Sequence, residues 1–270
     1  MIGHPTSLVD TAQEAPSTRT LGAVALIGGS EHRDVTRPID RWLMEHTGTS
    51  RVRVVVVPVA SSGRRMPSTA ALARTYWTSL GAAVSFVVPD PRRPVSSFSA
   101  LDDPDIVVLT GGVPNRVIRS LGMSPLWDRI LELWRSGTAL SGSSAGSMAL
   151  FDWRLRLVPP RPFELIPGLG PLSGYVALPH FDRYVADRPR HRALLDHVAH
   201  GFHGQGIVGL DEGTALVGWD DDYRVVGRGA VTLHDGRWTT YPSGSVVAVR
   251  LLPTTPDEPR PDRVPVAVAA

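Results

Sequence analysis

Short apolar runs that alternate with helical patterns constrain the fold of this 270-residue chain more than any other feature. Each run is rich in β-branched residues and ends in small residues, which is typical of strands that are buried on both faces. Such strands, separated by helices, predict a parallel sheet with helices on both sides. The expected strands span residues 23–29, 52–62, 82–90, 105–112 and 137–144, and the expected helices span 39–46, 69–80, 113–121 and 126–135.

The pattern changes after about residue 205, where short alternating strands are separated by turn signals. Asp235 and Gly236 fit a tight hairpin turn. This part predicts an antiparallel ribbon at the edge of the sheet. The expected fold class is therefore α/β, with a doubly wound, mostly parallel sheet flanked by helices and followed by a C-terminal antiparallel ribbon.

Both ends of the chain lack hydrophobic periodicity and are rich in Pro, Thr and charge. We expect flexible tails over 1–20 and 253–270, and one catalytic α/β domain over 21–252. The N-terminus has neither a basic start nor an apolar core of the kind found in secretory signals. No apolar run approaches the roughly 18 residues of a membrane span. These observations predict a cytoplasmic protein with no membrane partner.

Composition excludes several kinds of site. The chain has no cysteine, which rules out disulfides, thiolate metal sites and a cysteine nucleophile. All 28 Lys and Arg residues are arginine, and the sequence pI is about 9.4. The arginines are spread among carboxylates and form no stripe, so no nucleic-acid partner is expected.

The loops that follow the expected strands are rich in glycine and serine, as in GGSEH, ASSGR, TGGVPN and GSSAG. In a parallel sheet these loops share the carboxyl edge, so their side chains can converge. The last loop fits G-x-S-x-G, with Ser144 at the centre. In that motif a sharp turn from strand to helix lifts the serine hydroxyl above the sheet, and the next N–H, here that of Ala145, can face an oxyanion. The alternative is a Gly/Ser turn without chemistry.

A serine nucleophile needs a base and an acid. His180 follows an apolar strand and a proline, at a sheet edge, and is the favoured base. Asp211 and Glu212 follow another apolar strand, and because neighbours in an extended chain point to opposite faces, at most one should reach the site. Other histidines cluster on and after a helical pattern, where we favour solvated positions over a metal site, and His234 is expected to be exposed. The cluster consists of His191, His197, His200 and His203.

Taken together, LIGGSE, LTGG, GSSAG, PHFDR and GLDEGTALV resemble the cyanophycinase and aspartyl dipeptidase family of serine peptidases over roughly residues 22–250. The resemblance implies a class I glutamine amidotransferase-like fold and a triad of Ser144, His180 and Glu212. It further implies an oxyanion hole formed by the N–H groups of Gly112 and Ala145. The implied reaction is hydrolysis of a small peptide through an acyl-enzyme, without metal or organic cofactor. The family also suggests a homodimer.

The chain departs from this family near the expected site. Pro114 stands where cyanophycinases typically carry glutamine, and Leu178-Pro179 replaces a polar pair before the histidine. These departures argue against recognition of a β-aspartyl-arginine dipeptide. We expect another aspartyl or isoaspartyl peptide as substrate, with Asn115 and Arg183 as candidates to hold its carboxylate. The alternative is a family member with shifted specificity or lost activity.

Two unrelated functions compete with this interpretation. An α/β-hydrolase esterase also uses G-x-S-x-G, but its triad runs serine, acid, histidine and it needs an H-G-G-G-type loop, which is absent here. A nucleotide-binding module would use the loop LIGGSEH, which fits neither G-x-G-x-x-G nor a Walker loop.

Overall fold

The main sheet contains five neighbouring parallel strands, as the apolar runs predicted. The computed structural model describes residues 21–89, 99–122, 124–156, 164–186, 188–199 and 205–253. The parallel strands lie in the order β1, β5, β4, β2, β3. Their bounds are β1 Val24–Ile27, β2 Arg53–Val57, β3 Ala83–Phe86, β4 Ile106–Leu109 and β5 Ala139–Ser143. β1, β2 and β4 end before their small residues, which form loops at the carboxyl edge, whereas β5 includes Ser141, Gly142 and Ser143.

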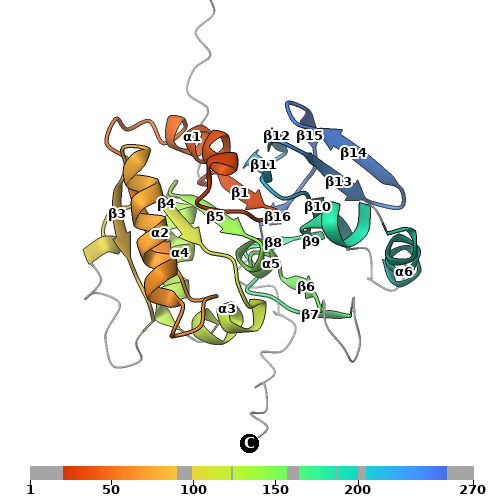
Figure 1. Cartoon of the computed structure of the whole chain (residues 1–270), viewed down its shortest axis with the longest axis horizontal. Coiled ribbons are helices and arrows are strands. Elements are labelled where there is room, and N and C mark those ends of the chain that lie inside the picture. The colour runs from red at the N-terminus through yellow and green to blue at the C-terminus, as the bar shows by residue number, and fades with distance from the viewer. Residues whose placement is uncertain are drawn as a thin grey trace, which may run out of the picture.

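Helices cover both faces of this sheet (Figure 1). On one face lie α1 (Arg37–Glu45) and α2 (Met66–Ser79), and on the other lie α3 (Pro114–Leu121), α4 (Pro125–Arg135) and α5 (Ala145–Ala149). The alternation within β2 shows how the sheet is filled. Val54 and Val56 join the core under α1 and α2, whereas Val55 and Val57 join the opposite core. Burial on both faces explains why the strands read as continuous apolar runs.

The C-terminal ribbon differs from the prediction, because its strands are divided between two sheets. The strands concerned are β9 Tyr175–Pro179, β10 Gly206–Leu210, β11 Thr214–Trp219, β12 Asp222–Gly227, β13 Ala230–His234, β14 Trp238–Pro242 and β15 Val246–Ala248. β11, β12 and β15 extend the main sheet antiparallel beside β1. β10, β13 and β14 join β9 in a second, four-stranded sheet, which lies beside the main one (Figure 1).

The reason for the division is the burial of β10 and β11. Every residue of β10 is buried, and so are the first five residues of β11. In a ribbon at the edge of the sheet, one face of each strand would be exposed to water. Here β10 lies between β9 and β13 in one sheet and β11 lies between β1 and β12 in the other, so both faces of each strand are covered. The chain changes sheet at residues 211–213, where Gly213 adopts a φ of 66°. This crossing carries the carboxylates of residues 211 and 212 between the two sheets.

The hairpin at Asp235-Gly236 is confirmed: β13 and β14 pair antiparallel, and Gly236 has a φ of 100°. His234 differs from the expectation of exposure, since its side chain is 12% exposed and its ring packs against Trp238. The other α-helix and strands of the described residues are α6 Pro189–Ala199, β6 Trp153–Leu155, β7 Leu165–Pro167, β8 Leu172–Ser173 and β16 Leu252–Pro253. Short helical turns span Asp34–Thr36, Ser99–Leu101 and Asp182–Ala186. The predicted tails lie outside the described residues, except that Pro253 pairs with β8.

Candidate active site

Ser144 sits on a strained turn between strand and helix. β5 ends at Ser143, α5 begins at Ala145, and the serine between them has φ 49° and ψ −107°. A Cβ on Gly142 would lie 2.7 Å from the carbonyl carbon of Gly146, and a Cβ on Gly146 would collide with the carbonyl oxygen of Leu109. Both glycines of the motif are therefore required by space. The turn has the geometry of a nucleophile elbow.

His180 brings its imidazole to this serine from the end of β9. Its Nε2 lies 2.9 Å from the Oγ of Ser144. The backbone of His180 has a φ of 52°, and its N–H donates to the carbonyl oxygen of Gly28 at 3.0 Å. The loop after β1 and the end of β9 thus meet at the histidine, which fixes the ring relative to the elbow.

Glu212 completes a continuous line of hydrogen bonds. Its Oε1 lies 2.8 Å from the Nδ1 of His180, and its Oε2 accepts from the Oγ of Ser30 at 3.2 Å. The guanidinium of Arg183 also reaches Oε2, at 2.7 Å. Burial on its own raises the pKa of Glu212, but the hydrogen bond from His180 and the charge of Arg183 outweigh it, so the pKa lies below its usual value. The carboxylate is therefore ionised at neutral pH.

Asp211 points away from this line, although both carboxylates lie in the turn between β10 and β11 and not in an extended strand. Its Oδ2 accepts from the backbone N–H of Ala230 at 2.9 Å. The backbone of Glu212 is held from two sides: its N–H donates to Asp182 Oδ1 at 3.1 Å, and its carbonyl accepts from Arg228 Nε at 3.1 Å. The crossing from β10 to β11 thus directs Glu212, and not Asp211, to His180, a choice that the residues alone left open.

Gly112 and Ala145, the two residues expected to supply the oxyanion hole, both follow strands at the carboxyl edge of the sheet. Ala145 is the first residue of α5, and the first N–H groups of a helix have no acceptor within it. Gly112 follows β4 with a φ of 143°, and a Cβ there would lie 2.5 Å from the carbonyl oxygen of Ala60. Only glycine fits that position, because both the φ and the space exclude a side chain.

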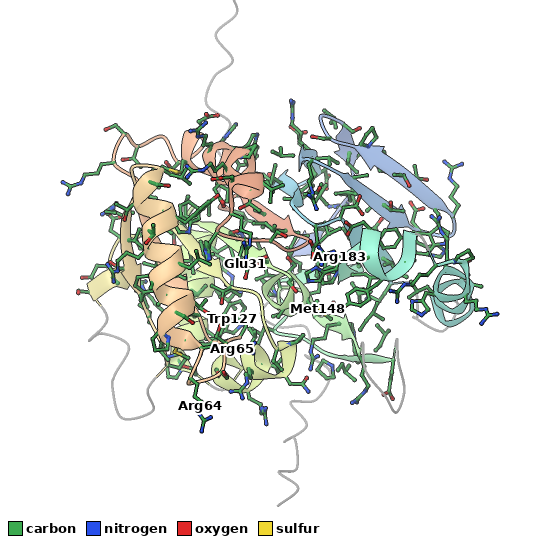
Figure 2. The ribbon with its side chains drawn as sticks, viewed as in Figure 1. Glu31, Arg64, Arg65, Trp127, Met148 and Arg183 are labelled. Atoms are coloured by element: carbon green, nitrogen blue, oxygen red, sulfur yellow. The ribbon has the colours of Figure 1, made fainter. Side chains whose placement is uncertain are left out.

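Glu31 ties the loop of Gly112 to the elbow. Its Oε1 accepts from the N–H of Gly111 at 2.7 Å, and its Oε2 accepts from the Oγ of Ser143 at 2.8 Å. Figure 2 shows Glu31 and Arg183 in the central part of the molecule, above Met148 of α5 in this view. Sequence reasoning did not single out Ser30 or Glu31. The signal was present, however, because both belong to the loop GGSEH at the carboxyl edge.

The two residues expected to hold a substrate carboxylate are both engaged within the chain. Arg183 pairs with Glu212, although its side chain remains 65% exposed. Asn115 is exposed in the first turn of α3, and its Oδ1 accepts from Nη2 of Arg154 at 2.6 Å. Arg154 was not predicted, since it stands in the short strand β6 without a motif around it.

The histidine cluster on α6 supplies no metal site in the part of the chain that the structure describes. His191 is placed with its Nδ1 2.6 Å from the carbonyl oxygen of Tyr184. The side chain of His197, and His200 and His203 as a whole, lie outside the described residues.

The order of the site residues differs from that of an α/β-hydrolase. His180, which is hydrogen-bonded to Ser144, precedes Glu212 in the chain, whereas in an α/β-hydrolase the acid precedes the histidine. None of the described helices is both long and apolar enough to cross a membrane.

Known proteins resemble this chain in sequence and in fold. Residues 24–226 match the model of Peptidase family S51. A cyanophycinase from Geminocystis herdmanii (strain PCC 6308) is 30% identical over 150 residues, which is 53% of this chain and 53% of that protein. The match thus spans about half the length of this curated relative. The crystal structure of a peptidase from an acI-B1 Actinobacterium has a similar fold, with a TM-score of 0.73 and 24% identity over 85% of this chain and 97% of that one.

Proposed function

Because the chain belongs to peptidase family S51, we propose that it is a serine peptidase that hydrolyses a small aspartyl or isoaspartyl peptide. The observation that carries the proposal is the unbroken line from the Oγ of Ser144 through His180 to Glu212, with separations of 2.9 and 2.8 Å. The strained turn at Ser144 supports a nucleophile over a plain Gly/Ser turn, because backbone strain of this kind gathers at functional sites.

The protonation states follow from what each group can donate. An ionised Glu212 only accepts, so the hydrogen of the neutral imidazole lies on Nδ1 of His180. Nε2 then carries a lone pair toward the hydroxyl of Ser144 and can remove its proton. Glu212 also stabilises the imidazolium that forms.

The proposed reaction proceeds by acyl transfer. The Oγ of Ser144 attacks the peptide carbonyl carbon while Nε2 of His180 takes the hydroxyl proton. The N–H groups of Gly112 and Ala145 stabilise the tetrahedral oxyanion. The C–N bond breaks as His180 returns the proton to the leaving amine. A water molecule, deprotonated by the same nitrogen, then hydrolyses the ester on Ser144 and releases the acid.

Shifted specificity is the second candidate, and the burial of β9 favours it. Leu178 is fully buried and packs in the core of the second sheet, and Pro179 is buried as well. The positions that carry a polar pair in cyanophycinases therefore contribute core packing here. A substrate of this chain would be recognised by other residues, among which we propose Asn115 and Arg183.

The test is a hydrolysis screen of α- and β-aspartyl dipeptides, in which the wild type is compared with Ser144→Ala. A serine-directed phosphonate is applied to the same proteins and its site identified by mass spectrometry. We expect release of the amino component and labelling of Ser144, both abolished by the substitution. Hydrolysis that survives in Ser144→Ala would disprove the assignment of the nucleophile. Labelling of Ser144 without cleavage of any aspartyl peptide would favour shifted specificity.

A further inference from the structure

Arg154 is a buried cation. Its residue is 7% exposed, and no carboxylate among the described residues forms an ion pair with it. Burial, together with the nearby charge of Arg156, lowers the pKa of Arg154 to about 10. A buried charge is costly unless it is paired. Arg156 differs, because it pairs with Glu164 at 3.0 Å and is one-third exposed.

The contacts of Arg154 turn its neighbour Asn115 into a donor. Nε of Arg154 donates to the carbonyl oxygen of Pro167 at 3.0 Å, and Nη2 donates to Oδ1 of Asn115 at 2.6 Å. Since a guanidinium cannot accept a hydrogen bond, the amide of Asn115 must face it with its oxygen. The amide NH2 group is then the part of this exposed side chain left for another molecule.

Helix α5 connects the pair to the elbow. Asn115 is three residues after Gly112, in the first turn of α3, where the N–H groups favour negative charge. α5, which begins next to Ser144, packs against both α3 and β6. The guanidinium of Arg154 and the amide NH2 group of Asn115 are thus joined at the first turn of α3, where hydrogen-bond donors and positive charge occur together.

We infer that Arg154 and Asn115 form a carboxylate-binding site that selects the acyl residue of the substrate. This inference rests on the proposed peptidase function and names the residues that read its substrate. In an aspartyl or an isoaspartyl peptide, one carboxyl group of the acyl residue is in the scissile bond and the other is free, two carbons away. A single anion site beside the loop of Gly112 therefore suits either linkage, because the guanidinium can form charge-assisted hydrogen bonds with a carboxylate.

A binding experiment tests the site without requiring catalysis. Succinate, which has the same spacing of carboxyl groups, and its neutral diamide succinamide are titrated into the Ser144→Ala protein by calorimetry. We expect succinate to bind and succinamide not to bind. Adding Arg154→Gln should lower the affinity for succinate at least about tenfold, because charge-assisted hydrogen bonds are lost. Arg156→Gln, which removes an equal charge that has its own partner, should leave succinate binding unchanged.

Asn115→Asp provides a second variant that keeps the buried arginine. The new carboxylate would pair with Arg154 and repel the ligand, so succinate binding should again be lost while the folded state is retained. The inference would be overturned if succinate failed to bind the Ser144→Ala protein. It would also be overturned if adding Arg154→Gln or Asn115→Asp to that protein left the affinity for succinate unchanged.

Cleavage of aspartyl and asparaginyl p-nitroanilides separates this inference from the proposed function. We expect wild-type protein to prefer the aspartyl compound and Asn115→Asp to lose that preference. If succinate binding depends on Arg154 but the protein cleaves neither compound, the proposed peptidase function is refuted and the carboxylate-binding site is retained. If both compounds are cleaved equally, if cleavage depends on Ser144 and if Asn115→Asp does not change it, the peptidase function is retained and the carboxylate-binding site is refuted.

Discussion

Gly29 lies directly against the imidazole of His180. A Cβ at position 29 would collide with Cε1 of the ring and would lie 2.8 Å from Nδ1. The φ of Gly29 is 145°, which side chains also disfavour. The backbone of the loop after β1 therefore forms one wall of the space in which the ring meets Ser144 and Glu212.

Gly29→Ala is expected to displace this ring and lower kcat. A misplacement of about 1 Å in a catalytic group can cost about 100-fold, and we expect a loss of that order. The measurement is kcat for the best aspartyl substrate, together with the rate of phosphonate labelling of Ser144. Gly63→Ala is the matched control, because a Cβ there meets nothing within 4 Å. Full activity in Gly29→Ala would show that the ring position is not critical.

Glu212→Gln is expected to lower kcat by up to about 10⁴-fold, because an amide can no longer hold the required tautomer of His180. The substitution should also change how stability depends on pH. The pKa of Glu212 is lowered in the folded protein, so its stabilisation is present above the ordinary pKa of 4.5 and is lost as the pH falls through the folded value. Urea unfolding between pH 7 and pH 3 should show this acid loss reduced in Glu212→Gln. Identical acid profiles for the two proteins would contradict the assignment.

Asp40 should have the opposite effect on stability. It is fully buried, Tyr76 donates to it at 2.5 Å, and burial raises its pKa to about 7. The folded protein binds this proton more tightly than the unfolded chain, so stability falls by about 1.4 kcal/mol per pH unit between about pH 4 and pH 7. Asp40→Asn retains an acceptor for Tyr76 and removes this slope. The gain of the variant over wild type, measured by urea unfolding, should be larger at pH 8 than at pH 4.5.

Glu31→Ala is expected to lower kcat by up to about 100-fold with a smaller change in KM. The N–H of Gly111 loses its acceptor, so the next peptide, which carries the N–H of Gly112, is no longer held in place. Glu31→Gln keeps an acceptor oxygen for Gly111 and should recover part of the activity. Steady-state kinetics of the three proteins provide the check. A change confined to KM would point to substrate contact instead of positioning of the loop.

Local patterns determined much of the fold. The valine-rich run of β2 and the apolar run of β4 indicated strands buried on both faces, and such strands imply a parallel sheet with helices on each side. The spacing of Gly142, Ser144 and Gly146 also indicated the elbow, because the steric limits that require glycine act between residues close in sequence and on the next strand. The apolar runs and the glycine spacing each lie within a short stretch of the chain, so a linear sequence displays them.

Contacts between distant segments were decided only by the tertiary structure. Asp211 and Glu212 are equivalent in the sequence, and the crossing of the chain from β10 to β11 turned one toward Ala230 and the other toward His180. The division of the C-terminal ribbon between two sheets likewise depended on which faces other strands could cover.

The pairing of Arg154 with Asn115 joins residues 39 positions apart, and that of Glu31 with Ser143 joins residues 112 apart. No local pattern encodes either pair. The sequence by itself determined the strands, the helices and the serine elbow, because the elements show a periodicity and the elbow a spacing of glycine and serine that a short stretch of chain displays. The tertiary structure decided which carboxylates, guanidinium groups and N–H groups meet there, because chain crossings bring together side chains that share no sequence neighbourhood.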